Sequence, residues 1–129
     1  MKRVYKSLVS MTLLLLLSGC SIIDEHLPSF WDDNESKKII DIYISVKKID
    51  CNGHFVMNRV NNVKNDVNWL LSYSTIKGSN DVVEMVSKFD TTLDGILSKK
   101  SISVSYCKVK KDLMKKQVRR IASGMMERY

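Results

Sequence analysis

The chain has 129 residues, of which 44% are hydrophobic and 27% charged, with five glycines and one proline. This composition excludes a disordered or low-complexity chain, and the length fits one packed domain rather than two. The formal net charge is +7, but it is unevenly distributed: residues 98–129 contain ten basic and two acidic residues, whereas residues 20–97 contain eight basic and twelve acidic residues. The chain therefore has a basic C-terminal part.

The N-terminal segment has the pattern of a secretory signal. Lys2, Arg3 and Lys6 precede an apolar run over residues 8–17, as they do in a cleaved signal peptide. A transmembrane helix needs roughly 20 predominantly apolar residues, so this run is too short to remain as a membrane span. Small residues follow it at positions 18 and 19, as a signal peptidase requires.

The sequence Leu17-Ser18-Gly19-Cys20 at the end of this run resembles the lipobox of bacterial lipoproteins. The resemblance covers residues 1–20. It implies cleavage before Cys20, attachment of a diacylglycerol to its sulfur, and acylation of the new amino group with a chain such as palmitate. One acyl chain gives only marginal attachment, at about 0.8 kcal/mol per buried CH₂, whereas three make a lasting anchor. The alternative is an ordinary secretion signal that leaves Cys20 as a thiol.

The residue after the cysteine indicates the destination. In bacterial lipoproteins an aspartate at this place tends to retain the product at the inner membrane, and here Ser21 occupies it. The resemblance therefore implies an outer-membrane lipoprotein that faces the periplasm or the cell surface. It divides the chain into a cleaved signal peptide (1–19), a lipid-anchored tether (20–33) and a helical domain (34–129).

The entry into the domain is marked by the acidic and amide residues Asp32-Asp33-Asn34-Glu35. Such residues favour a helix start as caps and through the positive end of the helix dipole. Phe30 and Trp31 precede them. This aromatic pair either folds over the first turn as a hydrophobic staple or lies at the level of the lipid headgroups.

Apolar residues at spacings of three and four predict amphipathic helices over about 34–50, 55–73, 80–97 and 105–128. With short connections, such helices predict an all-α fold, a small antiparallel four-helix bundle. The expected buried seams contain Ile39, Ile42, Val46 and Ile49; Val56, Val60, Val63, Val67 and Leu70; Val82, Met85 or Val86, Phe89, Leu93 and Ile96; and Met114, Val118, Ile121 and Met125.

The width of the first seam and the ends of the helices are less regular than the seams themselves. Ile40, Tyr43 and Ile44 are expected to broaden the first seam, and Asn52-Gly53 is expected to end the first helix in the left-handed conformation. Residues 102–105 alternate as a strand does, but a single short strand has no partner in this chain. We therefore expect a connection there.

Cys51 and Cys107 remain as a pair once Cys20 is assigned to lipid, and disulfides persist in exported proteins. In an antiparallel bundle the end of the first helix and the start of the fourth lie together, which predicts a Cys51–Cys107 disulfide. The alternative is metal binding with His54. Structural zinc sites need four ligands, and the second histidine, His26, lies on the tether, so we expect neither a metal nor a cofactor.

Signals of catalysis are absent from the sequence: it has no glycine-rich phosphate loop, no nucleophile elbow and no HExxH pattern. Asp90 and Asp94 are four residues apart and can face the same way on a helix, but solvated carboxylates are the usual reason for such a pair. The sequence therefore predicts a protein that is not an enzyme.

The basic segment is the second functional feature after the lipobox. It can form a solvated face, or it can contact anionic lipid headgroups, anionic cell-wall groups or an acidic envelope protein. Nucleic acid is not an expected partner of an exported, lipid-anchored chain. The basic residues are Lys99 and Lys100, followed on the last helix by Lys108, Lys110, Lys111, Lys115, Lys116, Arg119 and Arg120.

These features favour a lipid-anchored envelope protein whose non-catalytic bundle docks onto, or stabilises, another envelope component. The stretch over residues 27–34 resembles one in small lipoproteins of tailed-phage genomes. Together with the small size, that resemblance indicates a first alternative, a lysis lipoprotein similar to the outer-membrane spanin subunit. A lipoprotein that excludes competing phage from the surface is a second alternative, which fits the same anchor and size. Outer spanin subunits are often proline-rich, whereas this chain has one proline.

Overall fold

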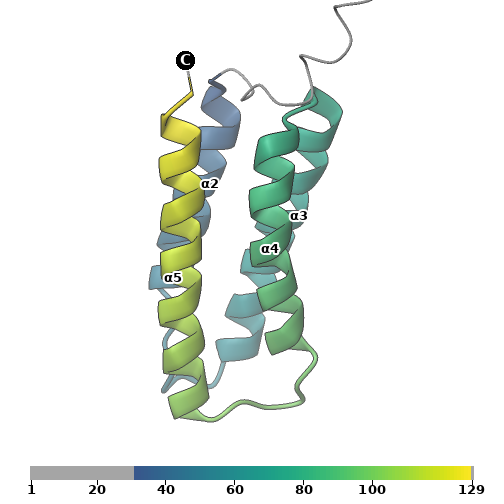
Figure 1. Cartoon of the computed structure of the whole chain (residues 1–129). Coiled ribbons are helices and arrows are strands. Elements are labelled where there is room, and N and C mark those ends of the chain that lie inside the picture. The colour runs from purple at the N-terminus through teal and green to yellow at the C-terminus, as the bar shows by residue number, and fades with distance from the viewer. Residues whose placement is uncertain (1–30, 129) are drawn as a thin grey trace, which may run out of the picture.

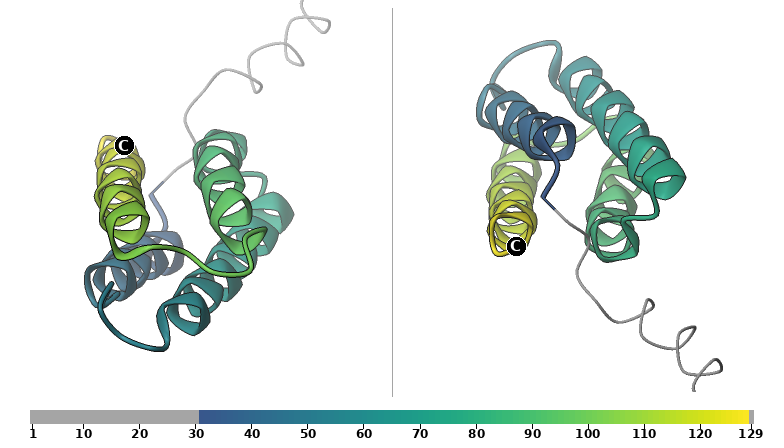
Figure 2. Two further views of the ribbon diagram at one scale, coloured as in Figure 1. Left: turned by 90° about the horizontal axis from the view of Figure 1, so that it is seen from below. Right: turned by 90° about the horizontal axis from the view of Figure 1, so that it is seen from above.

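The computed structural model describes residues 31–128 (Figure 1). Four α-helices follow one another up and down: α2 (Asp33–Lys47), α3 (Val56–Lys77), α4 (Asn80–Leu97) and α5 (Val104–Met126). Each helix packs against the next, and α5 returns to pack against α2, which closes a ring around one core (Figure 2). The predicted all-α, four-helix bundle is therefore confirmed. No helix in this part of the chain is long and apolar enough to cross a membrane.

The core consists of one seam from each helix, because side chains three and four residues apart project from the same face of a helix. The seams meet along the bundle axis, and their residues are those that the periodicity of the sequence predicts, except that Val56, at the start of α3, is only partly buried against the core. The buried apolar side chains are Ile39, Ile42, Val46 and Ile49; Val60, Val63, Val67 and Leu70; Val82, Val86, Phe89, Leu93 and Ile96; and Cys107, Met114, Val118, Ile121 and Met125.

The first helix ends earlier than predicted. The C-cap of α2 is Lys48 in the right-handed conformation, and the described glycine with a positive φ is Gly78, which ends α3. Gly53 needs no left-handed conformation because Asp50 closes the turn. The Asp50 carboxylate accepts from the backbone N–H of Asn52 at 3.0 Å, and the Asp50 carbonyl accepts from the N–H of Gly53 at 3.1 Å.

The segment between α4 and α5 is a connection, as expected, and not a strand. Ser103 starts the last helix because its side-chain oxygen accepts a hydrogen bond from the backbone N–H of Tyr106 at 3.1 Å. This is the usual geometry of a serine N-cap. The alternating residues 102–105 therefore belong to the end of the loop and to the first turn of α5.

The first seam is narrower than predicted. Tyr43 packs against the core, but the side chains of Ile40 and Ile44 are 44% and 42% exposed. The two neighbours of α2 cover only the sides that face them, and these isoleucines project outward from the bundle. The expectation that they broaden the buried seam is wrong, and they form part of the surface.

Trp31 does not form the expected hydrophobic staple. Its side chain is 45% exposed, and its indole N–H donates to the carboxylate of Asp33 at 2.7 Å. A staple joins the residue before the N-cap to the fourth helical residue, and that residue is the polar Ser36 because Asp32 is the N-cap. Phe30 lies outside the described residues.

Candidate functional site

The disulfide predicted from the sequence closes one end of the bundle. Cys51 and Cys107 are bonded, with their Cα atoms 5.6 Å apart. The bond joins the loop after α2 to the first turn of α5. His54, the other candidate ligand in this region, is exposed. Among the described residues no group of three His, Cys, Asp or Glu side chains is placed to hold a metal ion. Cys20 and His26 lie outside those residues.

The predicted basic residues of α5 divide into two sets. Lys108, Lys116, Arg119 and Arg120 are exposed, whereas Lys110, Lys111 and Lys115 are partly covered. The covered Lys111 is directed into the bundle, where its Nζ donates to the backbone carbonyl of Ile49 at 2.6 Å. Carbonyls at and after a helix end have no helical partner. Lys111 satisfies one of them and so joins α5 to the segment that follows α2.

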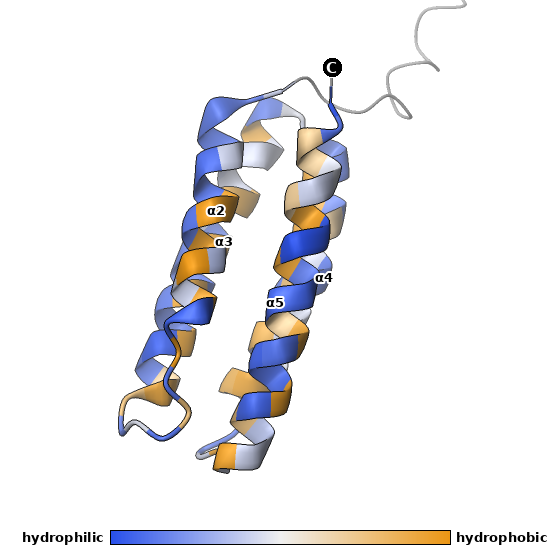
Figure 3. Cartoon of the chain, turned by 90° about the vertical axis from the view of Figure 1, so that its left-hand side faces the viewer, coloured by the Kyte–Doolittle hydropathy of each residue, from blue (hydrophilic) through white to orange (hydrophobic). Residues whose placement is uncertain are grey.

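A shallow apolar groove of about 330 Å³ separates α2 from α5 on the surface. Its lining contains Ile40 and Tyr43 from α2, and Arg119, Ala122, Ser123 and Met126 from α5. Figure 3 views the molecule from the side of these two helices, with apolar segments on α2 and near the C-terminal end of α5. Met126 is 57% exposed, whereas the neighbouring Met125 completes the core.

Tyr43 holds the centre of this groove between two cations. The Nε and Nη2 atoms of Arg119 donate to the Tyr43 hydroxyl at 3.0 and 2.8 Å. The guanidinium carbon of Arg119 and the Nζ of Lys47 lie 5.5 and 5.8 Å from the centroid of the Tyr43 ring, within the range of a cation–π interaction. Arg119 is therefore fixed on the groove instead of moving freely in solvent.

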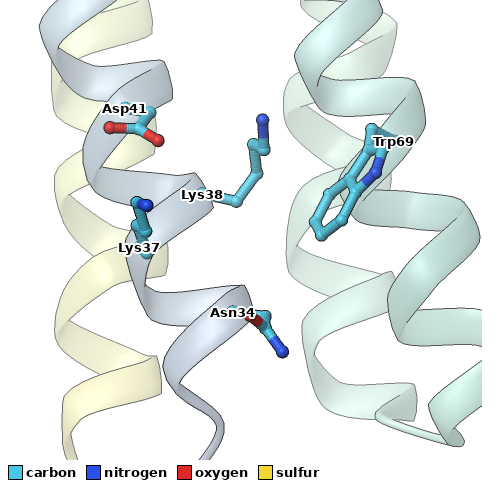
Figure 4. A pocket seen from close by; sticks show the side chains of 5 residues that line it. All are labelled: Asn34, Lys37, Lys38, Asp41 and Trp69. Atoms are coloured by element: carbon cyan, nitrogen blue, oxygen red, sulfur yellow. The ribbon is translucent and has the colours of Figure 1, made fainter.

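A second, smaller groove of about 210 Å³ lies between α2 and α3. Figure 4 shows Trp69 of α3 facing side chains from α2, which are Asn34, Lys37, Lys38 and Asp41. Trp69 is 45% exposed and stacks on Tyr73, with ring centroids 5.0 Å apart. The Nζ of Lys38 lies 4.9 Å from the centroid of the Trp69 ring, so a rigid aromatic surface is bordered by charged and amide groups.

A buried polar cluster closes the end of the bundle opposite the disulfide. The Nη1 of Arg128 lies 2.8 Å from the Oε2 of Glu35, and both side chains are at most 1% exposed. The Nη2 of Arg128 lies 3.0 Å from Asp81 Oδ2. Lys77 lies 3.3 Å from Glu35 Oε2 and 3.4 Å from Asp32 Oδ2. The cluster therefore connects the N-termini of α2 and α4 to the last residue of α3 and to Arg128, just after α5.

The carboxylate of Glu35 is kept charged inside this cluster. Burial alone would raise its pKa, but the Ser74 and Ser79 hydroxyls beside it and the hydrogen bonds from Arg128 and Lys77 more than offset burial, and the pKa lies below its ordinary value. Burial likewise opposes ionisation of Asp32, but the backbone N–H of Glu35 and the ammonium of Lys77 hold its pKa below the ordinary value. The two hydroxyls face Glu35 without a hydrogen bond of good geometry among the described residues.

The sequence contains a signal for this cluster that apolar periodicity alone does not reveal. Four polar residues continue the four seams by one further step at the same end of the bundle: Glu35, Ser74, Ser79 and Arg128. All four are buried. A polar residue at the next core position of every seam indicates a buried polar layer, whereas Glu35 alone fits a helix cap equally well.

Asp90 and Asp94 face the same way, as their spacing predicts, and the side chain of Lys64 contacts both carboxylates. The Nζ of Lys64 lies 2.6 Å from Asp90 and 2.7 Å from Asp94. Burial opposes the charge of Lys64, but the two carboxylates raise its pKa above the ordinary value. The pair joins α4 to α3, which is a structural role.

Comparison of the chain with protein-family models, with curated proteins and with solved structures gives no match.

Proposed function

We propose that this protein is an envelope lipoprotein, anchored through acyl chains on Cys20, whose helical bundle is a non-catalytic docking module for another envelope protein. The lipobox pattern at Leu17-Ser18-Gly19-Cys20 supports the anchor. The Cys51–Cys107 disulfide is consistent with an oxidising compartment such as the periplasm. Ser21 favours the outer membrane, as the lipoprotein resemblance implies.

The observation that carries the docking proposal is the exposed aromatic surface of the groove between α2 and α3. Tryptophan, tyrosine and arginine dominate the energetically important residues of protein interfaces. Tryptophan and tyrosine contribute large contact areas with only two rotatable side-chain bonds. Trp69 is held in one orientation by Tyr73 and Lys38, so little conformational entropy is lost when a partner covers it. The surrounding charged and amide groups can supply the polar rim.

The test is recovery of partners from membranes that contain the full-length, acylated protein, followed by mass spectrometry. We expect Trp69→Ala to reduce the recovery of a specific envelope protein at least tenfold. Ile76→Ala is the matched control, because Ile76 is also on α3 and is 88% exposed. If no envelope protein is enriched over a Cys20→Ser variant, or if both substitutions act equally, the docking proposal is wrong.

A further inference from the structure

We infer that the bundle lies on an anionic lipid bilayer through the face formed by α2 and α5, with the apolar groove between these helices turned toward the lipid. This α2/α5 face consists of Ile40, Ile44 and Lys47 on α2, and Lys116, Arg119, Arg120 and Met126 on α5, with Lys37 at its edge beside the groove between α2 and α3. The inference rests on the proposed lipid anchor and adds a second, non-covalent contact with the same membrane.

The centre of the face is apolar and exposed. Ile40 and Ile44 are 44% and 42% exposed, and Met126 is 57% exposed. Ile40 and Ile44 are one helical turn apart and therefore project in the same direction. Side chains of this kind insert into the boundary between headgroups and acyl chains when a helix lies in the plane of a membrane.

Cations surround this apolar centre. Along α2, Lys37 and Lys47 lie about one and two turns from Ile40; along α5, Lys116 and Arg120 lie on the stripe that leads to Ser123 in the groove. Within the described part of the chain the side chains of Lys116 and Arg120 form no ion pair or hydrogen bond. Four exposed acidic residues project from the same side, Asp33 and Asp41 on α2 and Asp112 and Glu127 on or just after α5, and they are fewer than the five cations of the face. The face therefore complements a negatively charged surface.

Arg119 and Tyr43 add a site for a lipid phosphate at the lip of the groove. Arg119 uses two N–H groups for the Tyr43 hydroxyl, and a guanidinium has five, so three remain for phosphate oxygens. The Tyr43 hydroxyl accepts both of those bonds and keeps its own proton for donation. Arginine with an oriented hydroxyl beside an apolar groove fits a phosphate whose acyl chains lie along Ile40 and Met126.

The length of the tether selects a bilayer over an acidic protein as the occupant. Cys20 is 11 residues before Trp31, and a fully extended chain of that length spans up to about 40 Å. Helix α5 has 23 residues and is therefore about 35 Å long. The whole face is within reach of the membrane that holds the anchor, and such tethering raises the effective concentration of lipid around the face.

The test uses the chain from residue 20 with Cys20→Ser, so that only the face can bind. This part of the chain retains all of the buried seams. Binding is measured by co-sedimentation with vesicles of phosphatidylethanolamine and phosphatidylglycerol, and with vesicles of phosphatidylcholine alone. We expect binding to the anionic vesicles, at least tenfold weaker binding to the neutral vesicles, and a further loss as salt is raised.

The face is identified by two variants with the same change in net charge. We expect Lys116→Glu/Arg120→Glu to weaken binding to anionic vesicles at least tenfold. Arg59→Glu/Lys88→Glu, on α3 and α4, should change it less than threefold. All four side chains are exposed, and circular dichroism verifies that each variant is folded. Equal losses in both variants, or equal binding to neutral vesicles, would overturn the inference.

Two further outcomes separate this inference from the function on which it rests. Palmitate labelling of the full-length protein in a bacterium tests the anchor on Cys20 independently of the vesicles. Labelled protein without vesicle binding overturns the inference and leaves the proposed anchor intact, whereas vesicle binding without labelling overturns the anchor alone. Binding to a designed helix of leucine and glutamate, with no binding to anionic vesicles, would identify an acidic protein as the occupant and overturn the inference.

Discussion

The two ends of the bundle are closed by different kinds of interaction. At one end a single covalent bond, Cys51–Cys107, joins α5 to the loop after α2. At the other end Glu35 and Arg128 form a buried ion pair, which Asp81 and Lys77 extend. The covalent end responds to the redox state of the compartment and is insensitive to pH, whereas the ionic end responds to pH and is insensitive to reductant.

The two ends also differ in their distance from the point at which the chain enters the bundle. Asp32, the N-cap of α2, shares Lys77 with Glu35, so the residue at which the chain enters the bundle belongs to the ionic network. The loop after α2 and the start of α5, which the disulfide joins, lie at the far end of the bundle from this entry point (Figure 1). Acidification therefore acts where the chain enters the bundle, and reduction acts at the opposite end.

The largest effect is expected when the covalent end is opened. Cys51→Ala/Cys107→Ala removes a bond that spans 56 residues of sequence, and the chain-entropy estimate for such a span is about 4 kcal/mol. We expect the free energy of unfolding in urea to fall by this amount at any pH between 5 and 8. Dithiothreitol should then have no further effect on the variant. A loss below about 1 kcal/mol would contradict the prediction.

A somewhat smaller effect is expected at the ionic end. Arg128→Ala leaves the Glu35 carboxylate buried, with Lys77 as its remaining cation at 3.3 Å, and breaking a buried pair costs about 3 kcal/mol. Arg120→Ala is the matched control, because it removes the same charge from an exposed site on α5 and should change stability by less than about 0.5 kcal/mol.

A double replacement tests the physical reason. Glu35→Leu/Arg128→Met removes both charges and keeps similar volumes, so it should recover most of the stability that Arg128→Ala loses. Equal losses for Arg128→Ala and Arg120→Ala in urea unfolding would show that the pair does not close this end.

The covalent end could be predicted from the sequence, and the ionic end could not. Cys51 and Cys107 remain as a pair when Cys20 is assigned to lipid, as the lipobox resemblance implies, and the periodicity of the seams places them together. Glu35 and Arg128 are separated by 93 residues, and charged residues are common at the start and end of helices, where they cap the backbone or face solvent. Only the continuation of all four seams by polar residues distinguishes this cluster from ordinary caps.

The two surface grooves, between α2 and α5 and between α2 and α3, could not be predicted from the sequence for a related reason. Periodicity shows which stripe of a helix is apolar, but not how much of it the neighbouring helices cover. Ile40 and Ile44 lie on the same amphipathic helix as Ile39 and Ile42. They are exposed because α3 and α5 cover the sides of α2 that carry Ile39 and Ile42, and not the side that carries Ile40 and Ile44. Trp69 is exposed on α3 for the same reason, and its position beside Lys38 depends on the packing of two helices.

The smallest effect is the pH dependence that the ionic end should give. The pKa of Glu35 is below its ordinary value of 4.5 in the folded protein, and that of Asp32 is below 3.8. Above these ordinary values the carboxylates are charged in both states and their full contribution to stability is present. As pH falls, the unfolded chain takes up protons first, so stability is lost until pH is below the folded-state pKa values.

Urea unfolding between pH 6 and pH 3 measures this slope. Glu35→Gln removes one of the titrating groups, and its curve of stability against pH should be flatter than that of the unmodified protein. The Cys51→Ala/Cys107→Ala variant should be less stable throughout but keep the original slope, because the disulfide does not titrate. A slope that changes in the cysteine variant and persists in Glu35→Gln would reverse the roles of the two ends.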